Sequence, residues 1–244
     1  MDRRKHTLGD QPPLEAVSRS LLLTIYDHLY AAFGPQHWWP GDSPFEIIIG
    51  AILTQNTAWT NVEKAIRMLK EKSAFTPKAL YRMPHEKLAI LIRSSGFFNV
   101  KAVRLKTWLT FFFTEYQGKM EQMFSEPGPI LRRKLLALRG LGPETVDSIL
   151  LYAGQKPYFV VDAYTRRIFT RHHFIDENST YDDIQHFFMT QLPQDVALYN
   201  EYHALIVQTA KRYCKTIPDC EHCPLQYLFQ KEESTCLSRT APKD

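Results

Sequence analysis

A Gly-x-Gly turn followed by proline constrains the fold of this chain more than any other feature. The turn is Gly140-Leu141-Gly142, with one apolar stretch before it and a second that begins at Pro143. Glycine permits a tight turn, and proline suits the first position of a helix because no amide hydrogen is lost there. The pattern predicts two helices joined by a hairpin. The bare backbone N–H groups at the start of the second helix could bind a phosphate.

Helix start signals recur along the whole chain. Residues 43–46, Ser-Pro-Phe-Glu, combine a capping box with proline at the first helical position, and Thr60 to Glu63 repeats the box. Apolar residues follow both signals at helical spacing. Residues 195–213 are the longest periodic run, and only residues 158–161 resemble a strand. The chain is therefore predicted to be all-α.

Composition excludes several classes of protein. Apolar residues make up 44% and charged residues 23% of the chain, as in soluble globular proteins. The longest apolar stretch, residues 47–53, is too short to cross a membrane, and no apolar segment directly follows the basic N-terminus to form a signal peptide. We therefore expect a cytoplasmic, nucleoid-associated protein without a membrane partner. The net charge of +4 is compatible with nucleic-acid binding. Judged by charge alone, however, the basic residues are better explained as solvent-exposed positions on helix faces.

All four cysteines lie near the C-terminus, at Cys214, Cys220, Cys223 and Cys236. Cys-x5-Cys-x2-Cys is typical of metal sites because a Cys-x2-Cys pair presents two thiolates to one centre. Two disulfides are the alternative, which the missing secretion signal disfavours. Four thiolates suit either Zn²⁺ or a [4Fe–4S] cluster, and the spacing does not separate the two.

The hairpin, Asp162 and the cysteines together resemble the helix-hairpin-helix DNA glycosylases, the superfamily of endonuclease III, over about residues 20–236. Short stretches are most similar to the type III 3-methyladenine DNA glycosylases; they are Trp38-Trp39-Pro40 and residues 53–57, 95–99, 142–145 and 161–164. The resemblance implies a two-lobed fold. A six-helix barrel lobe would span residues 36–156 and end in the hairpin, and residues 1–35 and 157–244 would form the second lobe. A monomer would bind double-stranded DNA across the cleft between the lobes.

The resemblance also implies a [4Fe–4S] cluster held by the four cysteines. Here five, two and twelve residues separate successive cysteines, against six, two and five in the family. The first three cysteines match this pattern, and Cys236 departs from it. Zinc remains the alternative metal.

Asp162 is the catalytic residue that the resemblance implies. An isolated aspartate before Ala163 would ordinarily be a helix cap, and the two roles can coexist. Breaking an N-glycosidic bond develops positive charge on the sugar. A nearby carboxylate can stabilise that charge and orient or deprotonate the attacking water.

Glu144 distinguishes two kinds of enzyme within the superfamily. Relatives that also cut the DNA strand carry lysine here, and its amine forms a Schiff base with the sugar. A carboxylate cannot form one. The sequence therefore predicts a monofunctional glycosylase that leaves an abasic site, with no catalytic role for Glu144 itself.

The type III resemblance implies a base pocket lined by tryptophans. Its predicted members are Trp38, Trp39, Pro40 and Trp59, together with Gln55 and Lys211. A methylated purine such as 3-methyladenine is cationic, and stacking it on indole gains about 0.5–2 kcal/mol. The alternatives are core tryptophans, a loop hydrogen bond for Gln55 and a solvated helix position for Lys211.

Further residues are predicted to contact DNA. Phe97 would wedge between bases while Gln55 lies near the space left by the flipped base. Phosphate contacts are expected from Gly140 and Gly142, and DNA contacts also from Asn99 and Thr145. The alternative for Phe97 is core packing.

The predicted function is base excision repair, by a DNA glycosylase that flips out and hydrolyses a damaged base, an alkylated purine in particular. Alternatives on the same fold are removal of an oxidised pyrimidine, of mismatched uracil or thymine, or of mispaired adenine. A non-catalytic module that binds DNA lesions is the alternative from another class. The nine histidines show no ligand spacing, and His203 is expected to pack in the core.

Overall fold

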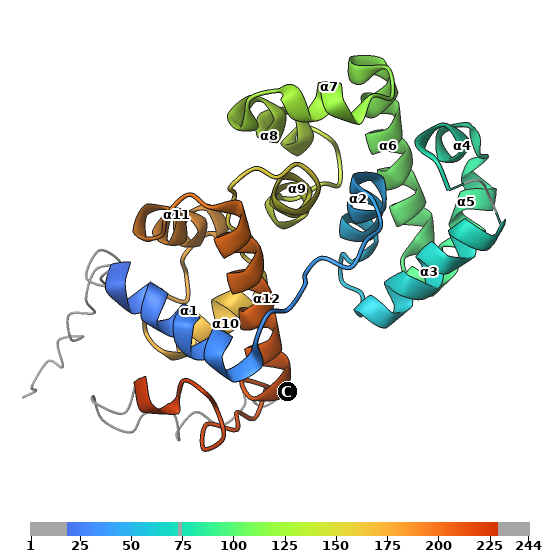
Figure 1. The fold of residues 1–244 in the computed structure, drawn as a ribbon. Helices are drawn as coiled ribbons and strands as arrows, with labels where there is room; N and C mark the ends of the chain where they lie inside the picture. Colours follow the sequence, from blue (N-terminus) through green and yellow to red (C-terminus); the bar gives the residue numbers. More distant parts are fainter. Residues whose placement is uncertain (1–18, 73–74, 229–244) are drawn as a thin grey trace, which may run out of the picture. The chain divides into compact units, whose positions relative to one another are not determined.

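The structure is a computed structural model that describes residues 19–72 and 75–228 (Figure 1). Every regular element in this part of the chain is helical, which confirms the all-α class. Residues 158–161, the strand-like segment, are irregular. Over the same described residues, no helix has both the length and the apolar character needed to cross a membrane.

Contacts along the chain divide it into two compact units. Among the described residues, one unit consists of residues 19–34, Ala163–Pro193 and residues 205–228, and the other of Pro35–Asp162 and Gln194–Ala204. The division falls within helix α12 (Val196–Arg212). Gln194–Ala204, which the sequence-based division assigns to the second lobe, groups here with Pro35–Asp162.

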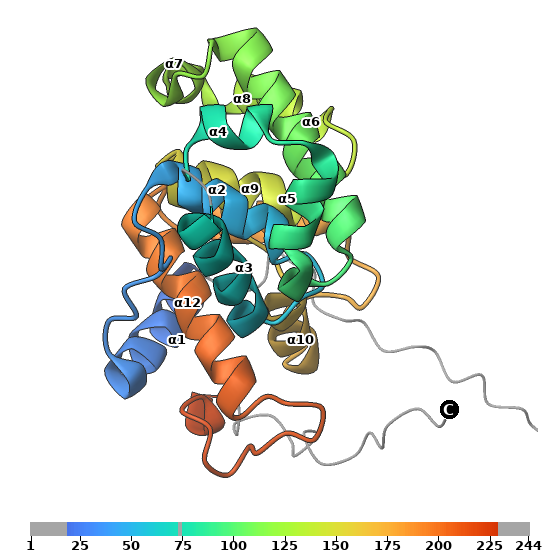
Figure 2. The ribbon, with the colours of Figure 1, turned by 90° about the vertical axis from the view of Figure 1, so that its right-hand side faces the viewer.

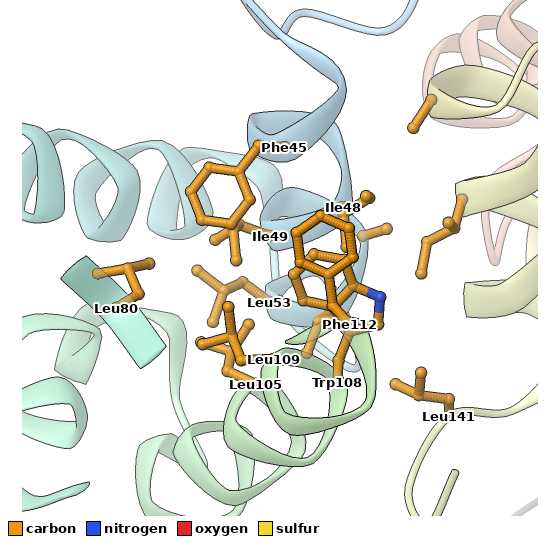
Figure 3. Close-up of a cluster of buried hydrophobic side chains, with 14 of the residues drawn as sticks. Phe45, Ile48, Ile49, Leu53, Leu80, Leu105, Trp108, Leu109, Phe112 and Leu141 are labelled. Carbon is orange, nitrogen blue, oxygen red and sulfur yellow. The ribbon is translucent and has the colours of Figure 1, made fainter. Parts of the chain in front are cut away.

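The unit around Pro35–Asp162 is built on one central helix, α2 (Pro44–Leu53). Nearly all of its side chains are buried, as expected for a helix that is apolar on every face. Its main packing partners are four elements of the same unit, and Figure 2 labels the α-helices among them. These four elements are α3 (Trp59–Lys72), α6 (Phe98–Tyr116), α9 (Pro143–Ser148) and the π-helical turn η3 (Ile149–Ala153). In Figure 3, Ile49 and Leu53 of α2 face Leu105 and Leu109 of α6.

Shorter helices complete this unit. They are α4 (Pro77–Arg82), α5 (His85–Leu91), the 3-10 turn η2 (Arg93–Ser95), α7 (Met120–Ser125) and α8 (Gly128–Leu136). α5 packs along α6, and α4 adds Leu80 to the core (Figure 3).

The two predicted capping boxes have different outcomes. At α2, the Ser43 hydroxyl accepts from the Glu46 amide at 3.2 Å as predicted, whereas the Glu46 carboxylate accepts from the Asp42 amide. The prediction of a capping box at Thr60 is wrong, because α3 already begins at Trp59. The Glu63 carboxylate accepts from the Trp59 indole at 2.7 Å, so its partner lies one turn earlier in the same helix.

The predicted hairpin joins α8 to α9. Gly140 has a φ of +94°, which L residues rarely adopt, and a Cβ there would lie 2.8 Å from the Arg104 side chain. A Cβ on Gly142 would instead meet open space. Arg132 of α8 clamps the two helices together through a bidentate ion pair with the fully buried Asp147 of α9, at 2.8 and 3.0 Å.

The other unit contains α1 (Arg19–Phe33), α10 (Ala163–Arg171), α11 (Tyr181–Gln191), the C-terminal part of α12 and the 3-10 turn η4 (Gln226–Leu228). Its core includes Phe169 and Phe188, whose rings meet edge to face at 4.7 Å. α11 begins with a complete capping box formed by Thr180 and Asp183.

Candidate active site

Four aromatic side chains form a wall centred on Trp39. The Trp39 ring centroid lies 5.7 Å from that of Trp38, 5.0 Å from that of Trp59 and 5.1 Å from that of Tyr152. Gly50 of α2 makes room for this wall, since a Cβ there would approach both Trp39 and Trp59 to 3.3 Å. The three tryptophans are partly buried and the adjacent Pro40 is exposed. The predicted tryptophans thus lie together, and Tyr152 joins them from a part of the sequence that predicted no site residue.

Asp162 connects to this wall through a buried histidine. The Asp162 side chain is 13% exposed, so part of it remains accessible to solvent. Its Oδ2 lies 3.5 Å from Nε2 of His203, and Nδ1 of His203 lies 2.6 Å from the Tyr152 hydroxyl. His203 is buried, as expected, but it faces a predicted catalytic carboxylate rather than apolar neighbours alone.

The surroundings of Asp162 accumulate negative charge. Glu144 is exposed in the first turn of α9, yet partial desolvation and the nearby Asp162 raise the pKa of its carboxyl, while His203 opposes this change. Burial, and to a lesser degree Asp162, raise the pKa of Tyr152 well above its usual value. Tyr152 therefore keeps its proton at neutral pH. A wall of indoles beside two carboxylates suits a flat cationic ligand.

Gln55 is held against the hairpin. Its side-chain amide donates to the Gly140 carbonyl at 3.1 Å and to the Thr145 hydroxyl at 2.8 Å, and its carbonyl accepts from Arg104. Thr145 is buried, so its hydroxyl faces Gln55 inside the unit. The loop hydrogen bond considered for Gln55 is therefore present, and a DNA contact by either residue stays a prediction.

Phe97 projects from a strained turn. Gly96 and Phe97 both have positive φ, at 65° and 45°, and the Phe97 side chain is 71% exposed. Core packing of Phe97 is therefore wrong. Asn99 is exposed in the following turn of α6. A large apolar side chain held in solvent is available to a ligand, although wedging between bases stays a prediction.

Lys101 is buried and ties together the loops that carry Gln55 and Phe97. Its Nζ donates to the Leu53 carbonyl at 2.7 Å, to the Thr57 hydroxyl at 2.6 Å and to the Ser95 carbonyl at 2.6 Å. Burial, with the nearby Arg104, lowers the pKa of Lys101 to about 8, so the amine is still mostly protonated at pH 7. Sequence reasoning missed this residue because a lysine in a helix ordinarily points to solvent.

Three of the four cysteines lie in the described residues and form no disulfide. Cys214 is buried, and its sulfur accepts from Arg171 at 3.3 Å while its carbonyl accepts from Arg167 at 2.7 Å. Within residues 19–72 and 75–228, however, no three His, Cys, Asp or Glu side chains gather as a metal site. Cys236 lies outside the described residues, so the ligand set stays a prediction.

Lys211 is exposed in the last turn of α12, and its role in the base pocket stays a prediction.

A cavity of about 420 Å³ borders Trp38 but does not include Asp162. We assign it no substrate. Its lining residues are His37, Trp38, Gln155, Asp195, Val196, Ala197, Asn200 and Glu201.

Comparison with known proteins bears on this site. Residues 49–194 match the sequence family described as "HhH-GPD superfamily base excision DNA repair protein". The chain is 44% identical to the "Putative DNA repair glycosylase MJ1434" of Methanocaldococcus jannaschii over 221 residues, which is 90% of this chain and 97% of that protein. It is 30% identical to endonuclease III of Thermotoga maritima over 184 residues, covering 75% of this chain and 81% of that protein.

A solved structure is similar as well. It is the H. pylori 3-methyladenine DNA glycosylase MagIII bound to 1,N6-ethenoadenine. The TM-score is 0.67 at 29% sequence identity, and the match covers 80% of this chain and 98% of that chain.

Replacing Lys101 should separate stability from DNA binding. Lys101→Met removes three hydrogen bonds inside the unit and should lower the free energy of unfolding by about 1–3 kcal/mol. Because the Gln55 and Phe97 loops lose their common anchor, affinity for a duplex containing an abasic-site analogue should fall about tenfold or more. Denaturant unfolding and fluorescence anisotropy measure the two effects.

Lys106 provides the matched control. It lies on the same helix, and its Nζ donates to the carbonyls of Leu80, Tyr81 and Met83, away from both loops. Lys106→Met should also destabilise the protein while leaving DNA affinity within about twofold. Equal losses of affinity in the two variants would contradict the anchoring role of Lys101.

Proposed function

Because this chain belongs to the HhH-GPD superfamily of base excision DNA repair proteins and is a DNA glycosylase, we propose that it excises alkylated purines such as 3-methyladenine by means of Asp162. One observation carries the proposal. An aromatic wall of three tryptophans is linked through Tyr152 and His203 to an accessible aspartate. The similarity to a 3-methyladenine DNA glycosylase supports the same substrate class.

The proposed chemistry follows from the charge of the substrate. A purine methylated at N3 carries positive charge, which weakens its glycosidic bond and favours stacking on indole. As the bond breaks, electrons leave with the base and positive charge develops on the sugar. Asp162 stabilises that charge and takes a proton from the water that attacks C1′. The products are the free base and an abasic site.

The same proposal assigns the DNA contacts. The hairpin amides at Gly140 and Gly142 hold a phosphate, and the open space beside Gly142 supports a close approach of the DNA backbone. Phe97, which is exposed, enters the base stack, and Gln55 lies at the vacated position.

Glu144 supports a glycosylase without lyase activity. Its carboxyl has no amine with which to form a Schiff base, and its position beside Asp162 places a second negative charge near the sugar.

We also propose that Cys214, Cys220, Cys223 and Cys236 hold a [4Fe–4S] cluster. The Cys-x5-Cys-x2-Cys spacing of the first three cysteines supports this assignment. Such a group would stabilise the C-terminal loop, and no step of the base-release reaction is assigned to it.

Asp162→Asn tests the catalytic assignment. Wild-type protein should release 3-methyladenine and 7-methylguanine from duplex DNA, and the variant should lose at least about 10³-fold in rate because the amide neither carries charge nor accepts the proton. Binding to an abasic-site analogue should persist. Duplexes with thymine glycol, uracil, or adenine opposite 8-oxoguanine test the substrate class. Release of one of these in place of alkylated purines would contradict it.

Borohydride trapping tests the absence of lyase activity. The wild-type protein should form no covalent adduct with DNA that contains an abasic site, whereas Glu144→Lys places an amine near the sugar and should form one. Endonuclease III of T. maritima serves as a comparison protein, and Arg139→Lys, on the exposed hairpin, controls for a new surface amine. A borohydride-dependent adduct with wild-type protein would overturn this assignment.

Visible absorption tests the cluster. Purified protein should be brown, with a broad charge-transfer band and about four iron atoms per chain. Cys223→Ser should reduce both the band and the iron content. A colourless protein that contains zinc would overturn the assignment.

A further inference from the structure

We propose that His203 is a positioning residue that orients the Asp162 carboxylate. We further propose that the Tyr152 hydroxyl fixes the tautomer of the His203 imidazole. The inference rests on the proposed catalytic role of Asp162. It concerns two residues that the sequence did not connect with the reaction, and it stands on two contacts within the unit around Pro35–Asp162, supported by one electrostatic interaction.

The first contact fixes the direction of the hydrogen bond between Tyr152 and His203. The Tyr152 oxygen lies 2.6 Å from Nδ1 of His203, and both side chains are buried. Burial and nearby carboxylates raise the pKa of Tyr152, so the phenol keeps its hydrogen. The Asp162 carboxylate, which faces Nε2 of His203 at 3.5 Å, only accepts hydrogen bonds and therefore favours a hydrogen on Nε2 rather than on Nδ1. The phenol hydrogen is therefore left for Nδ1.

The second contact follows from the first. When Nδ1 of a neutral imidazole accepts a hydrogen bond, the proton of the ring is on Nε2. Nε2 of His203 is buried and makes no hydrogen bond of its own in the described part of the chain. It faces Oδ2 of Asp162 at 3.5 Å. The N–H thus points at the carboxylate, and such contacts often shorten when substrate binds.

The electrostatic interaction between Glu144 and Asp162 explains what the histidine stabilises. Glu144 and Asp162 are close enough for Asp162 to raise the pKa of Glu144, and His203 opposes that effect. A donor at Nε2 compensates part of this repulsion and restricts the rotation of the Asp162 carboxylate. Its orientation matters because a displacement of about 1 Å from the reacting atoms can cost about 100-fold in rate.

The relay also connects the base pocket to the catalytic carboxylate. It runs from Tyr152, whose ring centroid lies 5.1 Å from that of Trp39, through His203 to Asp162. A base that stacks on the aromatic wall therefore contacts the same side chains that orient the carboxylate.

Substitutions at His203 and Tyr152 test the proposal by comparing rate with affinity. The amide nitrogen of glutamine reaches the place of Nε2, whereas that of asparagine reaches only the place of Nδ1. Single-turnover release of 3-methyladenine should therefore fall about 10- to 100-fold in His203→Asn and in Tyr152→Phe, and His203→Gln should recover most of the rate. The Kd for a duplex with a tetrahydrofuran abasic analogue should stay within about twofold in all three variants.

Tyr199→Phe is the matched control. Tyr199 is a buried tyrosine of the same unit, and its hydroxyl makes no hydrogen bond to the described residues. Its loss should leave base release unchanged. An unchanged rate in His203→Asn would overturn the proposal. So would a parallel loss of rate and DNA affinity, because that result indicates a structural role alone.

Two further measurements keep the test decisive. Nitrogen-15 NMR of histidine-labelled wild-type protein should show His203 with its proton on Nε2, and a proton on Nδ1 alone would overturn the proposal without any variant. Asp162→Asn distinguishes a failure of the proposed function from a failure of the positioning role of His203. If it retains full activity, the proposed function fails; if it is inactive while His203→Asn is fully active, only the positioning role fails.

Discussion

The burial of one helix, α2, determines where the candidate site lies. The loop with Trp38 and Trp39 leads into its first turn, and Gln55 follows its last turn. η3, which carries Tyr152, packs on one side of α2, and α6, which carries Lys101, packs on another. Since α2 is buried on nearly every face, it has little freedom to shift within its unit. The positions of these site residues relative to one another are therefore set by apolar packing around α2 and not by polar contacts alone.

Charge and aromatic surface act together in this site. Carboxylates near one another repel, and desolvation adds to the cost of keeping them ionised. A flat cation on the indoles would relieve this repulsion, whereas a neutral base would not. Under the proposed function, the electrostatics around Asp162 and Glu144 would favour a cationic base, and the tryptophans would contribute stacking.

The sequence predicted the helical class, the hairpin and the cap at Ser43 because these depend on neighbours within a few residues. Through a resemblance to a family it also predicted site roles for the three tryptophans and for Asp162, and these roles stay predictions. It did not reveal Tyr152, His203 or Lys101. His203 contacts a tyrosine 51 positions earlier in the chain, and Lys101 contacts a carbonyl 48 positions away. Such contacts depend on tertiary packing, which local patterns do not encode. The error at Thr60 has a similar origin, since Glu63 has an indole partner that a capping pattern ignores.

The π-helical turn has a consequence for how this site tolerates insertions and deletions. η3 accommodates one more residue per turn than an ordinary helix, and Tyr152 lies within it, ten positions before Asp162. Removing one residue from η3 would restore the α-helical register and rotate the following side chains by about 100° around the axis. The phenol would then point away from His203 even though every chemical group was still present. In η3, the number of residues therefore determines the direction of the Tyr152 side chain as much as residue identity determines its chemistry.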